Sequence, residues 1–491
     1  MDLRKISEEM KSSFNGGKTL CMNWRRNQLE AILKLVVENE EEILDALHTD
    51  LGKSQTEAYR DEVALVINAA RFALKNLHKW MAPIGVSLPL IAFYGSASLI
   101  AEPLGVVLIF TTWNFPFNLA LEPLVGAIAA GNAVVLKPSE MAAATSDLLA
   151  YLIPKYLDNS MIRVVQGGPE ECAKLLELKW DKIFFTGSAR IGRIVMTAAA
   201  KHLTPVTLEL GGKCPTIVDR MHSNDDLLVT AKRIVFGKWM LCNGQACVSP
   251  DYILVQEEIA AALVDSLKKT IKKFYGEDPS KSSDLSRIVN KNHFLRLTKY
   301  LQDPSIANTI VYGGRHDEKR LYMQPTILLN PPLTSDIMNE EIFGPLLPVI
   351  TMKRIEDSIE FINSRPKPLA IYLFTNRENL RKRLLNETSS GSLVFNDTGV
   401  QFALDGLPFG GVGESGLGKY HGKYSFDTFS HQKAVLYRSL FPEIFFRYPP
   451  WNAFKLNMLK TSLAFDYWGA VLVFLGLKKM CSEVNREQKM E

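Results

Sequence analysis

The first candidate for a reactive side chain is Cys247, in the segment GQACVSPDY that begins at Gly244. Glycine and other small residues beside a cysteine leave its sulfur accessible, and the thiolate form is the nucleophile. Most free cysteines, however, are buried packing residues. Cys247 is therefore either a nucleophile or a packing residue, and other parts of the chain must decide between the two.

Two further segments carry groups that a nucleophilic cysteine needs. Glu209 ends an apolar run in LELGGK, where desolvation would raise its pKa towards the range of a general base. Asn114 follows another apolar run in TTWNFPFNL, where its amide can stabilise a developing oxyanion. Each has a simpler interpretation: Glu209 as a capping carboxylate at a strand–loop junction, and Asn114 as a turn former before Phe-Pro.

Two more segments have features of a dinucleotide site. FTGSARIG, residues 185–192, ends an apolar run and opens a helical one, so its N–H groups and the Ser188 hydroxyl can meet a pyrophosphate. It lacks the full G-x-G-x-x-G fingerprint. In VLKPSE, Lys137 and Glu140 are placed to bond ribose hydroxyls, although a lone K-P-S-E segment is also typical of a solvated turn.

Composition and charge exclude several classes of protein. The net charge of +4 comes from the residues after His431, and the chain before them is neutral, so nothing indicates a nucleic-acid partner. The six cysteines lack the spacing of metal ligands, and no metal site is expected. The first eighteen residues are polar and charged, without a secretory apolar segment. We expect free thiols in a reducing, cytoplasmic compartment.

The pattern of apolar runs predicts an α/β fold. Short continuous runs alternate with Ala-rich helical stretches, as in proteins with a buried parallel sheet. A second α/β series begins at Thr204, and a chain of 491 residues exceeds one hydrophobic core. The expected strands include Val106–Thr112, Ala133–Ser139 and Lys182–Gly187, and the expected helices include Leu121–Gly131 and Glu257–Tyr275.

The end of the chain differs from the rest. Leu463–Leu477 is apolar apart from Asp466, and Lys478 and Lys479 follow it. Fifteen helical residues span about 22 Å, which is less than the roughly 30 Å of a bilayer core. We therefore expect this segment not to cross a membrane. It either lies at a membrane surface or packs against this protein or a partner subunit.

Considered together, the motifs resemble those of the aldehyde dehydrogenase superfamily, in the same order and over residues 28–431. The segments that begin at His202, Cys247 and Tyr420 resemble its class 3 branch, which includes fatty-aldehyde dehydrogenases. The motifs are TWNFPFN, LKPSE, FTGS-x-x-x-G, LELGGK, GQ-x-C, EEIFGP and LPFGGVGESGLG.

The resemblance implies a role for each matching residue. Cys247 would attack the aldehyde, the Asn114 amide and the Cys247 N–H would bind the oxyanion, and Glu209 would activate water to release an acyl group from Cys247. The remaining matches imply contacts to a nicotinamide cofactor from Lys137, Glu140, Gly187, Ser188, Ile191, Gly192, Glu341 and Phe343. We expect NAD to be preferred, because the Glu140 carboxylate repels a 2′-phosphate and Ile191 narrows the site, with NADP possible.

The resemblance also implies an architecture and partners. It predicts a Rossmann-like NAD-binding domain, an α/β catalytic domain and a bridging β arm that pairs two subunits of a homodimer. The expected boundaries are 1–80 and 102–209 for the NAD-binding domain, 210–415 for the catalytic domain, 81–101 and 416–435 for the arm, and 436–491 for the tail. Phe115, Phe117 and Phe402 predict an apolar tunnel for medium- or long-chain aliphatic aldehydes, including lipid-peroxidation products. The tail adds a possible contact with an intracellular membrane.

Some residues depart from the family pattern, and two rival functions stay open. Cys242 and Asn243 precede Gly244, whereas many relatives have Asn two places before this glycine. Cys242 is a second thiol near Cys247, Cys214 is expected to be a packing residue, and His421 a surface residue. The rivals are a catalytically silent relative with a binding or structural role, and a thiol esterase that uses Cys247 without a cofactor.

Overall fold

The computed structural model describes residues 2–92, 95–221 and 223–477. The described residues form two compact units. The first consists of residues from Met1–Trp80 and Pro103–Ser430, and the second of residues from Met81–Glu102 and His431–Glu491. The chain passes from one unit to the other at three places, after Trp80, Glu102 and Ser430.

The first unit begins with helices and continues into a six-stranded sheet with the order β17-β7-β6-β3-β4-β5. Its strands from β3 to β7 are parallel, and the short β17 is antiparallel to β7. The central strands are fully buried, as expected for a parallel sheet covered on both faces. The strands are β3 (Val106–Phe110), β4 (Ala133–Lys137), β5 (Ile162–Val164), β6 (Lys182–Thr186), β7 (Val206–Glu209) and β17 (Gly416–Leu417).

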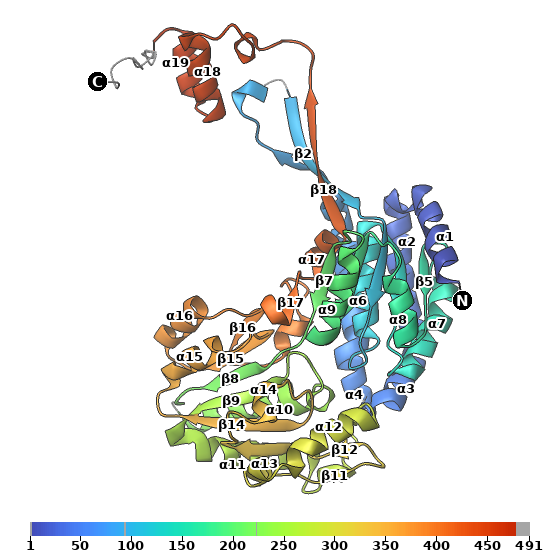
Figure 1. Ribbon diagram of the computed structural model, residues 1–491, viewed down its shortest axis with the longest axis vertical. Helices are drawn as coiled ribbons and strands as arrows, with labels where there is room; N and C mark the ends of the chain where they lie inside the picture. The colour runs from blue at the N-terminus through green and yellow to red at the C-terminus, as the bar shows by residue number, and fades with distance from the viewer. Residues whose placement is uncertain (1, 93–94, 222, 478–491) are drawn as a thin grey trace. The chain divides into compact units, whose positions relative to one another are not determined.

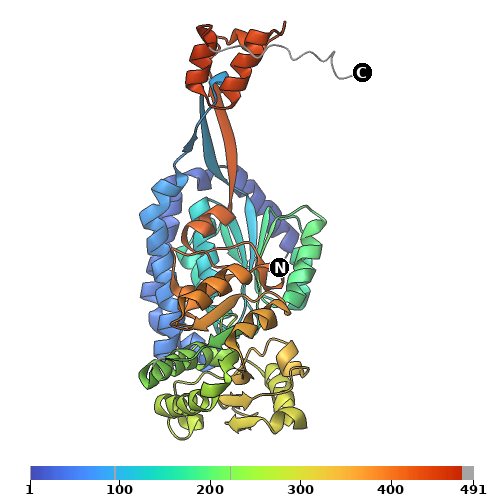
Figure 2. The ribbon, with the colours of Figure 1, turned by 90° about the vertical axis from the view of Figure 1, so that its left-hand side faces the viewer.

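Helices cover both faces of this sheet, as Figures 1 and 2 show. Helix α6 packs on β3 and β4 and also contacts α2 and α17, whereas α9 packs on β6 and β7. The helices are α1 (Leu3–Asn15), α2 (Met22–Glu38), α3 (Glu40–Leu51), α5 (Ala64–Met81), α6 (Asn118–Ala130), α7 (Ala143–Tyr156), α8 (Pro169–Leu176), α9 (Ala189–Ala200) and α17 (Gly422–Thr428).

The strand register brings several predicted site residues to one edge of this sheet. Phe110 lies opposite both Lys137 and Phe185, and Thr186 lies opposite Glu209. Parallel strands point their carboxyl ends the same way, so the segments after β3, β4, β6 and β7 all emerge at this edge. Ligands of open parallel sheets bind at that edge.

A seven-stranded sheet follows in the same unit, with the order β10-β13-β14-β9-β8-β15-β16. All its pairs are parallel except β10 (Ile310–Tyr312) with β13. Helices α10 and α11 pack together beside β9, and residues from both join one of its two apolar clusters. The main elements are β8 (Cys214–Val218), α10 (Asn224–Trp239), β9 (Pro250–Gln256), α11 (Glu257–Tyr275), α12 (Lys291–Gln302), β13 (Thr326–Leu329), β14 (Leu346–Met352), β15 (Ala370–Phe374), α16 (Glu378–Glu387) and β16 (Ser392–Phe395).

The predicted elements are present, with small differences at their ends. The helix expected over Glu257–Tyr275 has those bounds, and the helix expected from Leu121 begins three residues earlier at Asn118. The strands expected from Val106 and Ala133 end two residues earlier than expected, because the chain turns there into the loops that carry polar groups.

The second unit contains a three-stranded antiparallel sheet and a helical pair. The sheet has the order β1-β2-β18, from β1 (Ile84–Val86), β2 (Gly95–Pro103) and β18 (Ser430–Arg438). The pair consists of α18 (Ala453–Leu463) and α19 (Tyr467–Phe474), which share a small apolar cluster around Phe446 and Met458.

The apolar run at Leu463–Leu477 is therefore not one helix. It is interrupted after Leu463, and Asp466 caps α19 by accepting a hydrogen bond from the Gly469 N–H at 2.7 Å. Among the described residues, no helix has the length and apolar character needed to span a bilayer. Lys478, Lys479 and Cys481, which belong to the predicted tail, lie outside the described residues.

Candidate active site

A cavity of about 580 Å³ lies at the carboxyl edge of the six-stranded sheet and extends to the loops of the second sheet. It brings together seven of the residues predicted from the motifs: Asn114, Gly187, Ser188, Glu209, Cys247, Glu341 and Phe343. Lys137, Glu140, Ile191 and Gly192 do not line it. The other lining residues are Thr112, Trp113, Leu119, Thr186, Arg190, Leu210, Gly211, His293, Arg296 and Glu340.

The loop before Cys247 has an unusual backbone. Cys242, Asn243 and Gly244 follow one another with φ of 50°, 51° and 79°, a conformation that non-glycine residues rarely adopt. A Cβ on Gly244 would lie 2.3 Å from the Gly344 carbonyl oxygen, so only glycine fits between this loop and the EEIFGP loop. The departure at residues 242–243 thus coincides with a tight, left-handed turn before the loop that carries Cys247.

Gln245 fixes the same loop from within. Its Nε2 donates to the Cys242 oxygen at 3.0 Å and to the Arg287 oxygen at 2.8 Å, and its Oε1 accepts from the Val289 N–H at 3.1 Å. The side chain is fully buried, so these bonds are shielded from water. Gln245 therefore sets the position from which the chain reaches Cys247.

The thiol of Cys247 reaches the cavity, but its surroundings do not favour a thiolate. Burial raises its pKa to about 12, and the nearby Glu341 and Glu209 carboxyls add to the shift.

The other two thiols of this region are fully buried: Cys214 donates to the Cys247 carbonyl oxygen at 3.2 Å, and Cys242 has its pKa raised by burial. Cys214 thus packs as expected and also holds the backbone of Cys247.

Asn114 lies in the cavity wall and is bonded to the loop that carries Cys247. Its Nδ2 donates to the Gln245 carbonyl oxygen at 2.8 Å, and its Oδ1 has no protein partner among the described residues. An amide nitrogen carries two protons, so one N–H of Asn114 remains for a ligand. The residue is 2% exposed, which shields that N–H from bulk water.

Glu209 ends β7 and is also buried, at 3% exposed. Neither carboxyl oxygen has a hydrogen-bond partner among the described residues. Burial holds the pKa of Glu209 well above its usual value, and the charge of Glu122 adds to the shift. A carboxyl with these properties can take up a proton from water at neutral pH more readily than an exposed one.

The EEIFGP loop presents Glu341 and Phe343 to the cavity. Arg296 holds the loop by donating to the Ile342 carbonyl oxygen at 2.6 Å, and the Phe343 ring lies 5.4 Å from that of Trp113. The φ of Phe343 is 47°, a strained value of the kind found at ligand-binding positions. Burial raises the pKa of Glu341 to about 8.

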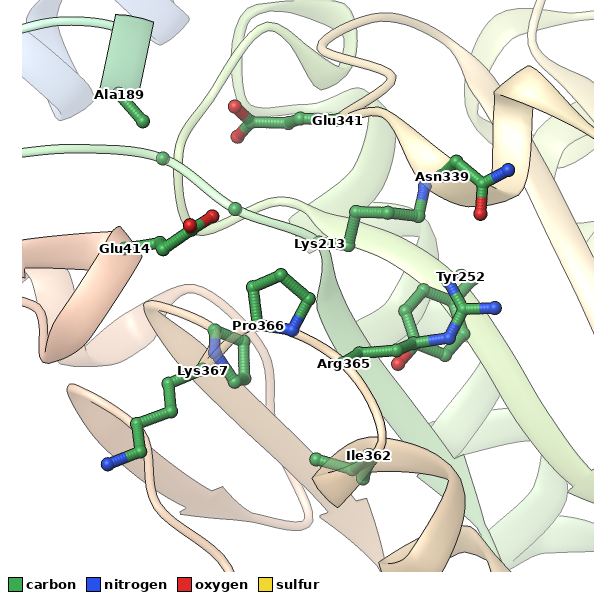
Figure 3. A pocket seen from close by; sticks show the side chains of 13 residues that line it. Ala189, Lys213, Tyr252, Asn339, Glu341, Ile362, Arg365, Pro366, Lys367 and Glu414 are labelled. Atoms are coloured by element: carbon green, nitrogen blue, oxygen red, sulfur yellow. The ribbon is translucent and has the colours of Figure 1, made fainter.

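A smaller cavity of about 200 Å³ adjoins the first and shares Gly211 and Glu341 with it. Figure 3 shows Lys213 reaching towards Asn339 while the Glu341 carboxyl group points towards Ala189. The Lys213 Nζ donates to the Ile337 and Glu340 carbonyl oxygens, both at 2.8 Å, and is paired with Asp251. Lys213 therefore fixes the segment that leads to Glu341.

The amino end of α9 supplies the third wall. Ser188 caps this helix, and the Gly187 N–H donates to the Glu209 carbonyl oxygen at 3.0 Å. The Thr186 hydroxyl is buried without a partner among the described residues, and a Cβ on Gly192 would be 2.8 Å from the Leu210 side chain. Free N–H groups at a helix start, an unpartnered hydroxyl and a large cavity fit a pyrophosphate and its nucleosides.

Lys137 and Glu140 follow β4 at the same edge. The Lys137 Nζ lies 2.6 Å from the Glu140 Oε2, with the lysine buried and the glutamate exposed. A paired cation and carboxylate present one donor and one acceptor, as ribose hydroxyls require. Within the described part of the chain, no three His, Cys, Asp or Glu side chains are grouped as a metal ion would need.

The family model for the aldehyde dehydrogenase family matches residues 1–435. The chain belongs to the aldehyde dehydrogenase family. It is 54% identical to aldehyde dehydrogenase family 3 member F1 of Arabidopsis thaliana over 96% of this chain and 97% of that one. It is 46% identical to family 3 member A2 of Rattus norvegicus over 92% of both chains. The resemblance to the class 3 branch is thus confirmed.

Solved structures show the same fold. The substrate-bound state of Staphylococcus aureus AldH matches with a TM-score of 0.90 at 42% identity, over 95% of this chain and 100% of that one. A glyceraldehyde-3-phosphate dehydrogenase of Methanocaldococcus jannaschii complexed with NADP matches with a TM-score of 0.77 at 25% identity, over 89% and 94% of the two chains. The predicted α/β fold, the oxidation of aldehydes to acids and the use of a nicotinamide cofactor are confirmed.

Several residues of this aldehyde dehydrogenase were missed by sequence reasoning. Trp113 belongs to the TWNFPFN motif, but the motif predicted no role for it. The centroid of its ring lies 5.1 Å from that of His293. His293 and Arg296 come from α12, whose sequence shows an amphipathic pattern and no motif. Only a three-dimensional arrangement could have linked that helix to the cavity.

One expectation about a single residue was wrong. His421 was expected at the surface, but it is 1% exposed, and its Nε2 lies 3.2 Å from the Glu122 Oε1. Its ring stacks on Phe409 with centroids 5.1 Å apart. Burial lowers the pKa of His421 to about 3, so this histidine is neutral at physiological pH.

Proposed function

We propose that this enzyme oxidises aldehydes through an acyl group carried on Cys247. The observation that carries the proposal is one cavity that contains the sulfur of Cys247, an available N–H of Asn114 and the buried carboxyl of Glu209. These are the nucleophile, the oxyanion donor and the base that the reaction requires. The amino end of α9, Glu341 and Phe343 in the same cavity provide room for the cofactor beside them.

Each side chain has one task in this scheme. The Cys247 thiolate attacks the aldehyde carbonyl, and the Asn114 amide and the Cys247 N–H bind the oxygen of the resulting thiohemiacetal. NAD(P)⁺, when bound, accepts the hydride. Glu209 then takes a proton from the water that hydrolyses the Cys247 thioester and releases the acid. The buried surroundings keep other water away from the acyl group.

Production of NADH from an aldehyde tests this assignment and separates it from the two rivals. We expect steady NADH production by the wild type and its loss in Cys247→Ser, with cofactor binding retained in the variant. A silent relative would give no NADH with either protein. A thiol esterase would hydrolyse esters but would not depend on the cofactor.

We propose that NAD is preferred over NADP. The support is Glu140, whose exposed carboxylate is held by Lys137 at the edge where the adenosine ribose is expected. A 2′-phosphate there would meet a like charge, and Ile191 would narrow the site further. The ratio of kcat/KM for the two cofactors measures the preference. An equal or higher value with NADP would contradict it.

We propose aliphatic aldehydes of medium or long chain, including lipid-peroxidation products, as substrates. The cavity wall includes Trp113, Leu119 and Phe343, which belong to one apolar cluster with Phe115 and Phe402. Phe115 and Phe402 stand 5.7 Å apart but do not line the cavity itself. Phe117, also expected to line a tunnel, is fully buried away from it. A series of kcat/KM against chain length should rise beyond short aldehydes.

We propose that the second unit serves two contacts. Within the described residues, β18 pairs with β2 on one side only, and an open strand edge of nine residues suits pairing in a homodimer. The α18–α19 region exposes large apolar side chains, including Trp451, Trp468 and Phe474 at 60%, 79% and 63%. Tryptophan side chains favour the membrane–water interface, so this surface suits binding to an intracellular membrane. The rest of the enzyme would then lie in the cytoplasm.

Two measurements test these contacts. Light scattering after gel filtration should give twice the chain mass, and a monomer would contradict the dimer. Co-sedimentation with vesicles of phosphatidylcholine and phosphatidylserine should fall when the chain is truncated after Leu440 and in the double variant Trp451→Ala/Trp468→Ala. Unchanged binding in both would show that the tail packs on protein instead.

A further inference from the structure

A buried ion pair lies behind the proposed oxyanion site. Lys53 follows α3 after Gly52, and Glu62 lies in the π-helical turn η2 (Tyr59–Val63). Their side chains are both 0% exposed and form an ion pair. Burying two charges costs as much as their attraction returns, so such a pair is weak evidence for stability. The other hydrogen bonds of Lys53 and Glu62 indicate the role of the pair.

The pair binds the backbone at Asn114 and again at Phe117 and Asn118. The Lys53 Nζ donates to the Asn114 carbonyl oxygen at 2.9 Å. The Glu62 Oε2 accepts from the Phe117 N–H at 2.8 Å and from the Asn118 N–H at 3.2 Å. The ammonium group also lies 4.1 Å from the centroid of the Phe115 ring.

The other backbone bonds of this segment lie on either side of Asn114: the Thr111 N–H donates to the Lys137 carbonyl oxygen at 3.1 Å, and the Phe115 carbonyl oxygen accepts from the Leu119 N–H at 2.9 Å. The segment runs from the end of β3 at Phe110 to the start of α6 at Asn118, and it has no regular structure of its own. The side chain of Asn114 is tied to the Gln245 oxygen, but a side-chain bond leaves the peptide free to shift. An oxyanion donor misplaced by about 1 Å loses much of its effect.

We propose that Lys53 and Glu62 are positioning residues that hold the Asn114 amide in the oxyanion site. The inference rests on the proposed role of Asn114. Neither residue touches the substrate; they act through the backbone of residues 114–118. The charge of Lys53 is available for this task, because the attraction of Glu62 and other nearby acidic groups outweighs burial and the pKa of Lys53 stays above its usual value.

Two reactions of one thiol test the proposal. Acylation of Cys247 by p-nitrophenyl acetate passes through an oxyanion, whereas alkylation by iodoacetamide displaces iodide and forms none. In Lys53→Met we expect the acylation rate to fall by about 10- to 100-fold, because part of the roughly 100- to 1,000-fold effect of an oxyanion donor is lost. The alkylation rate and the Kd for NADH should stay within about twofold of wild type, because nothing near the sulfur or cofactor changes.

Two further variants keep the test decisive if Lys53→Met folds poorly. Glu62→Gln keeps the shape of the side chain and one acceptor, and should reduce acylation less than Lys53→Met. Lys53→Met/Glu62→Gln removes the unpaired charge and should fold better while acylation stays slow. Arg377→Met is the matched control, since it breaks the pair of Arg377 with the buried Asp219 and contacts no residue of the cavity.

Asn114→Ala separates this inference from the proposed function. If Asn114→Ala slows acylation and Lys53→Met adds less than twofold in that background, both residues act through one amide. If Asn114→Ala slows acylation and Lys53→Met does not, only the inference fails. If Asn114→Ala has no effect, the proposed oxyanion role fails. Equal losses of acylation and alkylation in Lys53→Met would show general damage and overturn the inference.

Discussion

The carboxyl group of Glu341 occupies the space that a side chain on Gly211 would need. A Cβ on Gly211 would lie 2.3 Å from the Glu341 Oε2 and 2.5 Å from its Oε1. Gly211 is the first glycine of the LELGGK motif, so the motif that contains the proposed base Glu209 also makes room for the proposed cofactor-binding residue Glu341. The absence of a side chain at Gly211 therefore links the segment of the proposed base, Glu209, to the position of Glu341.

Gly211→Ala should weaken cofactor binding with little loss of stability. The added methyl group meets the end of a flexible side chain, so Glu341 can move and the backbone need not. We expect KM for NAD to rise by about tenfold, or about 1.4 kcal/mol of binding energy. The control is Gly406→Ala, where a Cβ would meet no atom within 4 Å. An unchanged KM would contradict the role of Glu341.

Lys213→Met should also weaken cofactor binding, because Lys213 holds residues that precede Glu341 of the EEIFGP loop. Lys213 binds two carbonyl oxygens before Glu341, and its loss leaves Asp251 without its cation. We expect KM for NAD to rise by about five- to tenfold and the free energy of unfolding to fall by about 3 kcal/mol. Lys367→Met is the control, because Lys367 is an exposed lysine of the same smaller cavity (Figure 3). Equal effects of the two substitutions would count against a specific role for Lys213.

Local sequence predicted the parts of the site that lie at strand ends. Glu209 and Gly187 follow buried apolar runs, and parallel strands must bring their carboxyl ends to one edge. The helix at Glu257–Tyr275 was predicted with its observed bounds, because its charged and apolar residues alternate with helical period over nineteen residues.

Residues that depend on distant packing were not predictable in this way. Lys53 and Glu62 belong to a charged stretch that is typical of a solvated helix, but both are buried and form hydrogen bonds with residues 114–118, which lie far along the sequence. His421 is buried because Glu122 and Phe409 pack against it. The run at Leu463–Leu477 is apolar apart from Asp466, so the pattern alone did not show that it is interrupted before α19, where Asp466 caps the helix.

Alkylation of Cys247 in the cofactor-free enzyme should depend strongly on pH. Its pKa is raised to about 12, so below that value the thiolate fraction grows about tenfold for each pH unit. Glu341, with a pKa of about 8, ionises within the same range, and its charge then opposes the thiolate. The wild-type rate should therefore rise less steeply above pH 8, and Glu341→Gln should be faster there.

Peptide mass spectrometry after iodoacetamide treatment measures this reaction for Cys247 alone. The gap between wild type and Glu341→Gln should be small at pH 7, where Glu341 is mostly protonated, and should widen up to pH 9. A plateau of the wild-type rate near pH 8 would show instead that the free enzyme already holds a thiolate.

Glu209→Gln should separate the two halves of the reaction. Without the carboxylate, the acyl group still forms on Cys247 but its hydrolysis lacks a base, so the first turnover should be retained and later turnovers should slow by about 100- to 1,000-fold. Stopped-flow NADH absorbance should then show a burst equal to the number of active sites. Glu387→Gln, which alters an exposed pair with Arg383 on α16, is the control.

In wild type, burial holds the pKa of Glu209 high, so the base form and the deacylation rate should increase as pH rises from 6 towards that pKa. A deacylation rate that is independent of pH over this range, or a Glu209→Gln variant without a burst, would assign the base to another residue.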